Sequence, residues 1–197
     1  MIKIYLVGIS CVGKTTIGEL LAKEIGFSFY DFDKEIEKYF NIPIEYIQEK
    51  HFNFCGYRNE TSIVLKELLN KEENSVIASC PSGLRDNYLS KYKMFKKNKE
   101  NTIISVHITD KPENIVERLT FYDKESKLLE IKLNEKEKNL YLKKIRKDIT
   151  FYKKFNNRAD YKFSIENIKL KDIPKTLIEF LRSKNKEFKI LSKEQFC

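Results

Sequence analysis

The most constraining feature of the sequence is the segment 8–15, GISCVGKT, which fits the pattern G-x-x-x-x-G-K-[ST]. An apolar run at 2–8 precedes it, and an amphipathic helical pattern at 13–26 follows it. A loop of this pattern between a strand and a helix binds a phosphate, because its backbone N–H groups and the helix N-terminus point at the anion. In such a loop Lys14 reaches between the β- and γ-phosphates, and the Thr15 hydroxyl binds Mg²⁺. The segment therefore predicts a nucleotide-binding α/β domain.

Strands and helices alternate along the rest of the chain. Apolar or alternating runs predict further strands at 27–33, 75–80, 101–109 and 161–166. Helical patterns occur at 34–40, 43–50, 58–71, 112–119, 134–156 and 173–184. Strands separated by helices imply a parallel sheet with helices on both faces, which binds ligands at the carboxyl ends of its strands. We expect one domain over 1–184 and a C-terminal tail at 185–197.

Composition narrows the choice of partners and compartment. The net charge is +9, but only six of the 38 cationic residues are arginine, and the lysines are interleaved with glutamate. This pattern favours a solvated basic surface over a nucleic-acid-binding stripe. No apolar run approaches the ~20 residues of a membrane span. Four cysteines form no C-x-x-C pair, and no signal peptide is evident, which predicts a reduced, cytoplasmic chain. We expect a monomer that binds neither nucleic acid nor membrane.

Two carboxylates follow the second expected strand. Asp31 and Asp33 are two residues apart in FSFYDFD, so on a strand both would face one side, at the end where the phosphates are expected. Phosphoryl transfer needs one group that holds Mg²⁺ and another that takes or orients the proton of the acceptor hydroxyl. Alternatively, Asp33 is the N-cap of the next helix and Asp31 a solvated strand end. A guanine-reading N-K-x-D motif is absent, so a small kinase is favoured over a GTPase.

An arginine begins a later expected helix. Arg58 follows a glycine turn in GYRNETSIVLKELL, and its planar fork could bind a substrate carboxylate. The alternatives are an ion pair with Glu60 or a surface charge.

These segments together resemble the shikimate kinase family. The similarity covers most of residues 2–181, and its specific element is the spacing from the phosphate loop to the D-x-D pair and on to Arg58. The resemblance implies a three-layer P-loop kinase fold of the α/β class, with a five-stranded parallel sheet flanked by helices. It also implies a mobile lid at about 119–135 and a substrate-binding helical region at about 34–60. The implied reaction is ATP-dependent phosphorylation of shikimate to shikimate 3-phosphate, in aromatic amino acid biosynthesis.

The resemblance also implies a role for individual residues, with ATP as co-substrate and Mg²⁺ as cofactor. The implied catalytic residues are Lys14 and Asp33, and the implied Mg²⁺ ligands are Thr15 and Asp31. The residues implied to bind ATP are Cys11, Val12, Gly13, Lys14, Thr15, Thr16 and Arg118, the last beside the adenine. The residues implied to bind the acceptor are Asp33, Arg58, Cys80, Pro81, Ser82 and Arg146.

The acceptor half departs from the family pattern. A triple glycine in the family lies against shikimate, and this chain has Cys80-Pro81-Ser82 in its place. Proline removes an N–H donor and fixes φ. The Arg-Pro-Leu-Leu of the family lid is Ser126-Lys127-Leu128-Leu129 here, with Lys124 or Lys127 as a stand-in for the arginine. Lysine supplies charge but no bidentate fork.

Two further family positions differ. The second substrate-binding arginine of the family lies a few residues before a late tyrosine. Arg146 before Tyr152 is our candidate, at a longer spacing than in the family, and Arg158 competes with it. The glutamate three residues after the first arginine is Thr61 here. Shikimate is the leading acceptor. The alternatives are a kinase for another small metabolite or nucleoside, and a nucleotide-binding regulator with little or no transfer.

Overall fold

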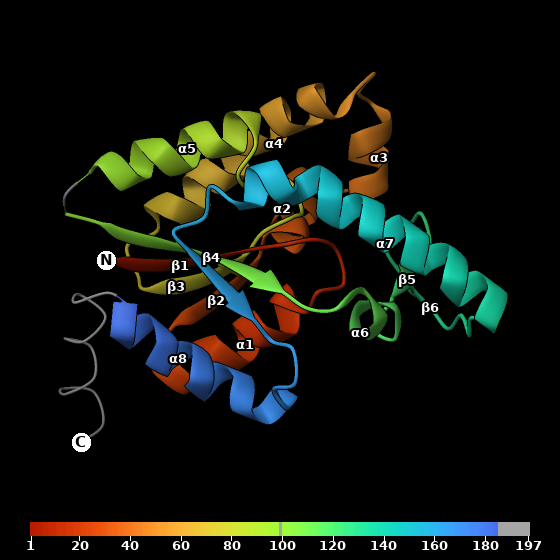
Figure 1. The fold of residues 1–197 in the computed structure, drawn as a ribbon. Coiled ribbons are helices and arrows are strands. Elements are labelled where there is room, and N and C mark those ends of the chain that lie inside the picture. Colours follow the sequence, from red (N-terminus) through yellow and green to blue (C-terminus); the bar gives the residue numbers. More distant parts are fainter. Residues whose placement is uncertain (99, 185–197) are drawn as a thin grey trace.

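A five-stranded parallel sheet forms the centre of the protein (Figure 1). The computed structural model describes residues 1–98 and 100–184. The strand order is β2-β3-β1-β4-β7, and every pairing in this sheet is parallel. The strands are β1 (Ile2–Val7), β2 (Ser28–Asp31), β3 (Ser75–Ala78), β4 (Thr102–Thr109) and β7 (Tyr161–Ser164). The predicted fold class is confirmed.

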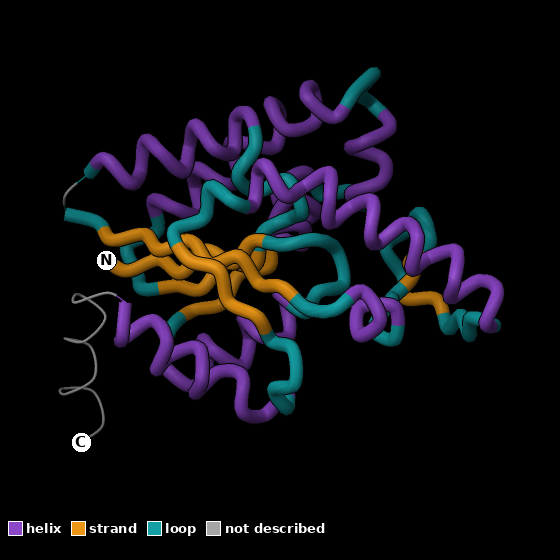
Figure 2. The backbone as a smooth tube through the Cα atoms, viewed as in Figure 1, coloured by secondary structure: helices purple, strands orange, loops and turns teal. Residues whose placement is uncertain are grey.

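Helices cover both faces of the sheet, as the purple and orange tubes of Figure 2 show. In the view of Figure 1, α4 and α5 lie above the sheet, and α1 and α8 lie below it. The helices are α1 (Lys14–Ile25), α2 (Phe32–Phe40), α3 (Ile44–Glu49), α4 (Phe54–Asn70), α5 (Asp86–Lys97), α6 (Pro112–Val116), α7 (Glu135–Asn156) and α8 (Ile173–Lys184), with a 3₁₀ turn η1 (Leu170–Asp172) before α8. A small hairpin, β5 (Phe121–Tyr122) and β6 (Leu128–Leu129), lies between α6 and α7.

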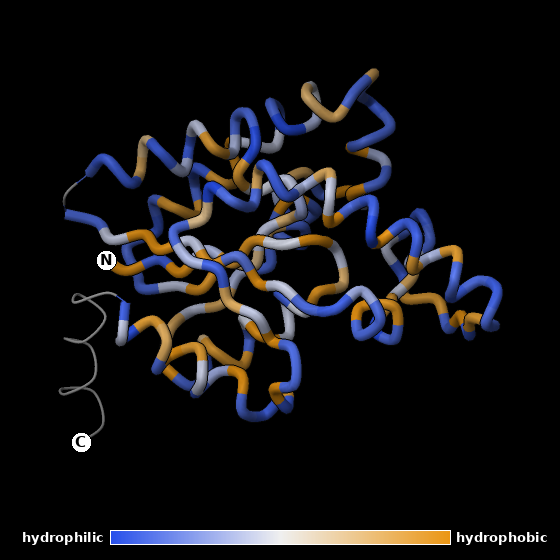
Figure 3. Tube along the Cα trace, in the orientation of Figure 1, coloured by the Kyte–Doolittle hydropathy of each residue, from blue (hydrophilic) through white to orange (hydrophobic). Residues whose placement is uncertain are grey.

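The three central strands β1, β3 and β4 are largely apolar because both faces of the sheet are covered. In β1, the side chains of Ile4 and Leu6 belong to one buried cluster, and those of Tyr5 and Val7 belong to the other. The first cluster includes apolar residues of α1 and α8, and the second includes those of α4 and α5. In Figure 3 the hydrophobic colours gather largely on the strands, whereas blue predominates on the outer turns of the helices. The two buried clusters hold the sheet from both faces, and the predicted site residues lie at one edge of this sheet.

Several elements differ from the sequence-based predictions. β2 ends at Asp31 rather than at residue 33, and α4 begins at Phe54, where the Asn53 side chain caps it by accepting N–H bonds from Cys55 and Gly56. The helix α5 was not predicted, and the segment 120–133, which showed no clear period, contains the β5–β6 hairpin. The predicted tail at 185–197 lies outside the described residues. Within the described ranges, no helix combines the length and the hydropathy that a bilayer crossing requires.

Candidate active site

The phosphate loop connects β1 to α1 at the carboxyl edge of the sheet. A Cβ on Gly8, where φ is +151°, would lie 2.7 Å from the carbonyl oxygen of Ile108, so only glycine fits there. Gly13, with φ +105°, provides the left-handed N-cap of α1. Lys14 is buried, and its Nζ donates to the carbonyl oxygen of Ile9 at 2.8 Å, across the loop. Burial lowers the pKa of Lys14, while the nearby Asp33 carboxylate opposes this shift.

A short hydrogen bond joins this loop to the acidic pair. The Thr15 hydroxyl donates to Asp31 Oδ2 at 2.6 Å. The other oxygen, Oδ1, accepts the backbone N–H groups of Asp33 (3.1 Å) and Lys34 (3.3 Å), so Asp31 is the N-cap of α2. The prediction that both carboxylates lie on a strand is therefore wrong, because the Asp31 side chain ends the strand and begins the helix. The alternative that Asp33 is the N-cap is also wrong.

Asp33 lies in the first turn of α2, close to the other charged groups of the loop. Burial, together with the like charge of Asp31, raises the pKa of Asp33 to about 6, against the attraction of Lys14. Lys14 and Asp33 also influence the pKa of Cys80, which follows β3. The phosphate loop, the acidic pair and the loop after β3 thus meet at one edge of the sheet.

The loop that replaces the triple glycine is tightly held. Burial raises the pKa of the Cys80 thiol to about 12, and its Sγ lies 3.3 Å from the Ser82 Oγ. The N–H of Gly83 donates to the Cys80 carbonyl at 3.0 Å, which closes a turn around Pro81. The Tyr5 hydroxyl in the core donates to the Gly83 carbonyl at 3.1 Å. The side chains of Cys80 and Ser82 therefore contact each other, and the turn between them has fixed backbone bonds.

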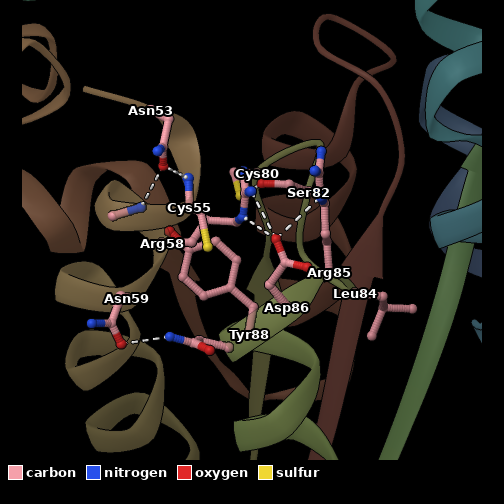
Figure 4. A network of polar contacts seen from close by, with 12 residues as sticks. Asn53, Cys55, Arg58, Asn59, Cys80, Ser82, Leu84, Arg85, Asp86 and Tyr88 are labelled. Atoms are coloured by element: carbon pink, nitrogen blue, oxygen red, sulfur yellow. Dashed lines mark hydrogen bonds and ion pairs between the residues drawn. The ribbon is translucent and has the colours of Figure 1, made fainter. Parts of the chain in front are cut away.

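Arg58 lies on α4 and is only 4% exposed. Its Nε and Nη2 donate to Asp86 Oδ2 at 3.0 and 2.7 Å, and Arg85 Nε lies 3.2 Å from the same oxygen (Figure 4). The alternative ion pair of Arg58 with Glu60 is not formed, since Glu60 bonds to His51 Nε2 at 2.5 Å instead. Neither Arg85 nor Asp86 was predicted from the sequence. Their only signal was a charged pair directly after the altered glycine loop.

The remaining predicted arginines lie in different places. Arg118 donates to Asp110 at 2.5 Å, in the segment where Thr120 Oγ1 approaches the phosphate-loop residue Cys11 to 3.9 Å. Arg146 is exposed and pairs with Glu113 of α6 at 2.8 Å. No hydrogen bond or ion pair recorded among residues 1–98 and 100–184 joins Arg146 to the Arg58–Asp86 pair.

The segment predicted as a lid contacts α2 and α3. Ser126 donates to Glu37 of α2, and Lys124 pairs with Glu49 of α3 at 2.7 Å. The Tyr46 hydroxyl of α3 donates to Glu125 at 2.5 Å. We call these three bonds the lid clasp. Lys124 is thus engaged with α3, and its role as a stand-in for the lid arginine stays a prediction, as does that of Lys127.

Comparison with known proteins identifies the family. The family model described as shikimate kinase matches residues 10–181. The chain belongs to the shikimate kinase family. It is 28% identical over 181 residues to a shikimate kinase of Flavobacterium johnsoniae, covering 92% of this chain and 99% of that protein. It is 39% identical over 85 residues to a shikimate kinase of Aquifex aeolicus, and this match spans about half (49%) of that protein's length. The structure of the Acinetobacter baumannii shikimate kinase in complex with shikimate superposes with a TM-score of 0.70 at 26% identity, covering 93% of this chain and 94% of that one.

As a shikimate kinase family member, the chain brings most of its predicted nucleotide-side residues together. Lys14, Thr15, Asp31 and Asp33 meet, and the segment with Arg118 adjoins the phosphate loop through Thr120. Of the residues predicted to bind the acceptor, Cys80 lies close to Asp33, and Arg58 contacts Asp86, which Arg85 also approaches. The roles of the individual residues stay predictions.

Proposed function

We propose that the chain transfers the γ-phosphoryl group of ATP to a hydroxyl of shikimate, giving shikimate 3-phosphate. The observation that carries this proposal is the 2.6 Å hydrogen bond from Thr15 to Asp31. It joins a phosphate loop to a pair of carboxylates, which are the two parts that phosphoryl transfer to an alcohol requires. Family membership supports shikimate as the acceptor.

The residues at this junction suit Mg²⁺. The Thr15 hydroxyl and the Asp31 carboxylate are hard oxygen donors, and Mg²⁺ in phosphoryl-transfer sites takes one or two carboxylates together with phosphates and waters. When bound, the ion neutralises charge on the transferring phosphoryl group. Lys14 then binds phosphate oxygens, and Asp33 accepts the proton of the acceptor hydroxyl. Arg58 binds the acceptor's carboxylate with its planar fork.

The test is ADP release from Mg²⁺–ATP with and without shikimate. We expect shikimate-dependent turnover that Lys14→Ala abolishes, because the phosphates lose their cation. Asp33→Asn should bind ATP nearly normally and lose transfer, because the amide cannot take the proton. Normal turnover in the Lys14 variant would refute the kinase mechanism, and normal turnover in the Asp33 variant would remove the role of Asp33.

A second candidate acceptor is another small hydroxylated acid, favoured by the Cys80-Pro81-Ser82 turn that replaces the triple glycine. A metabolite panel separates the two acceptors. ATP binding with no turnover on any hydroxyl acceptor would favour a nucleotide-binding regulator.

We further propose that the protein acts as a cytoplasmic monomer that binds no nucleic acid, with 119–135 as its lid. Sedimentation, and polyanion binding measured against salt, test the monomer and the absence of nucleic acid.

A further inference from the structure

Two arginines converge on one carboxylate oxygen beside the altered glycine loop. Arg58 approaches Asp86 Oδ2 from α4, and Arg85 approaches it from the other side, from the loop before α5 (Figure 4). We propose that Arg85 is the second arginine that binds the acceptor's carboxylate, and that Asp86 is an internal carboxylate occupying this arginine pair until the acceptor displaces it. The inference rests on the proposed function and specifies how its acceptor is recognised.

Arg85 is held in place but has binding capacity left. Its guanidinium stacks on two rings of α7, with centroid distances of 5.7 Å to Phe151 and 4.7 Å to Phe155. Its Nε is buried and finds no hydrogen-bond acceptor in the part of the chain that the structure describes. The 3.2 Å contact with Asp86 is thus an ion pair without a hydrogen bond. A buried N–H without an acceptor favours an added oxygen ligand.

Asp86 has the properties of a replaceable partner. Arg58 is almost fully buried, and a buried guanidinium needs a carboxylate beside it. Asp86 supplies one, yet its own side chain is 38% exposed, so it can leave toward solvent without crossing the core. Its φ of +48° is in the left-handed region, which adds backbone strain to this arrangement. An incoming carboxylate restores the same charge balance that Asp86 provides.

The position of the pair fits an acceptor held near Asp33. Arg85 donates its backbone N–H to the Ser82 carbonyl at 2.9 Å, so it is fixed to the turn that contains Cys80. Burial raises the pKa of Cys80, and the nearby Asp33 carboxylate raises it further. The turn is therefore bonded to Arg85 through its backbone and lies close to the proposed catalytic carboxylate.

The test compares an acid with its neutral analogue. Binding of shikimate, methyl shikimate and cyclohexanecarboxylate is measured by calorimetry in the presence of an unreactive ATP analogue, and kcat and KM are measured for shikimate. Arg85→Gln should weaken binding of both acids about tenfold, since hydrogen bonds to charged groups are lost. It should raise the KM for shikimate to a similar extent and leave methyl shikimate binding nearly unchanged. Arg85→Lys, which keeps the charge without the fork, should fall between. Lys93→Gln, an equal charge change at an exposed position of α5, is the matched control and should change nothing.

Asp86→Asn tests the internal carboxylate. It should tighten binding of both acids several-fold, because the competitor is lost, and should leave methyl shikimate nearly unchanged. Weaker acid binding in Asp86→Asn, or equal effects of Arg85→Gln on shikimate and its ester, would overturn the inference. If Asp86→Asn does not fold, the Arg85→Gln and Arg85→Lys variants test the inference on their own. Cyclohexanecarboxylate has no hydroxyl to phosphorylate, so it reports acid binding alone. If acid binding depends on Arg85 but shikimate is not turned over, only the proposed function is refuted. Absence of binding by either acid would refute the inference.

Discussion

Replacing Asp160 with asparagine should lower the free energy of unfolding by about 2 kcal/mol at pH 7. Asp160 lies directly before β7, and its Oδ2 accepts the N–H and the hydroxyl of Ser105 on β4 at 2.9 and 2.8 Å. The Tyr92 hydroxyl of α5 lies 2.7 Å from Oδ2 and 2.9 Å from Ser105 Oγ, so its single proton is shared between them. Asp160 also pairs with Lys96. One carboxylate thus joins α5, β4 and the chain entering β7.

The magnitude follows from the bonds that change. A hydrogen bond to a neutral acceptor contributes about 1 kcal/mol, and one to a charged acceptor contributes about 1 kcal/mol more. Asparagine keeps one oxygen of the same shape for the two unshared bonds from Ser105, so each loses about 1 kcal/mol. The pair with Lys96 adds little, because the lysine side chain is 45% exposed.

The effect should depend on pH in a defined direction. Burial raises the pKa of Asp160, but hydrogen bonds from Lys96, Ser105 and Tyr92 together outweigh it and hold the pKa below its usual value. A carboxyl whose pKa is lower in the folded state stabilises the fold above its unfolded pKa, near 3.9, and loses this contribution as pH falls through the folded value. The difference between wild type and Asp160→Asn should therefore shrink below about pH 4.

Urea unfolding at pH 7, 5 and 3.5, followed by far-UV circular dichroism, measures this difference. Glu72→Gln, which removes an exposed carboxylate, is the control and should change stability little at any pH. A difference that stays constant from pH 7 to 3.5 would show that the ionised carboxylate is not what joins the three elements.

Three further outcomes follow from the site. Cys80 should react with iodoacetamide at pH 8 far more slowly than the exposed Cys55, because burial raises its pKa to about 12; peptide mass spectrometry measures both rates. Gly83→Ala should destabilise the protein by about 2 kcal/mol in urea unfolding. The added Cβ would lie 2.4 Å from Ser79 Oγ, and unchanged stability would mean the turn relaxes freely. Arg58→Lys should raise the shikimate KM about tenfold in steady-state kinetics by losing the bidentate fork; an unchanged KM would place Arg58 outside the pocket.

The nucleotide half was predictable from the sequence because its signals are local. The phosphate loop, the strand before it and the amphipathic helix after it occupy 2–26 without interruption, and the structure has β1 and α1 there. The acidic pair was harder. Only Asp33 was considered as the cap of the next helix, and a sequence pattern does not show which of two nearby carboxylates accepts the backbone N–H groups. Only the structure assigns that role to Asp31.

The acceptor half depends on contacts that are distant in sequence. Arg58 and Asp86 are 28 residues apart, and nothing near Arg58 in the sequence marks its partner. The helix that begins at Asp86 had a readable signal, since its buried residues Tyr88, Tyr92 and Phe95 recur at helical spacing. Four lysines among twelve residues obscured that stripe. Because Asp86 is the first residue of α5, the partner of Arg58 was missed together with this helix.

The lid clasp has a consequence for how the two substrates bind. Glu37 accepts the Ser126 hydroxyl of the lid and also the backbone N–H of Ile44, at the start of α3, at 2.9 Å. It lies one helical turn after Asp33 on α2, so one carboxylate connects the segment predicted as a lid, the helix that carries Asp33, and α3. If nucleotide and acceptor each bind better when the lid clasp is formed, then either ligand stabilises the clasped state to which the other binds. Nucleotide and acceptor should therefore bind with positive cooperativity, and each should raise the affinity of the other by the same factor.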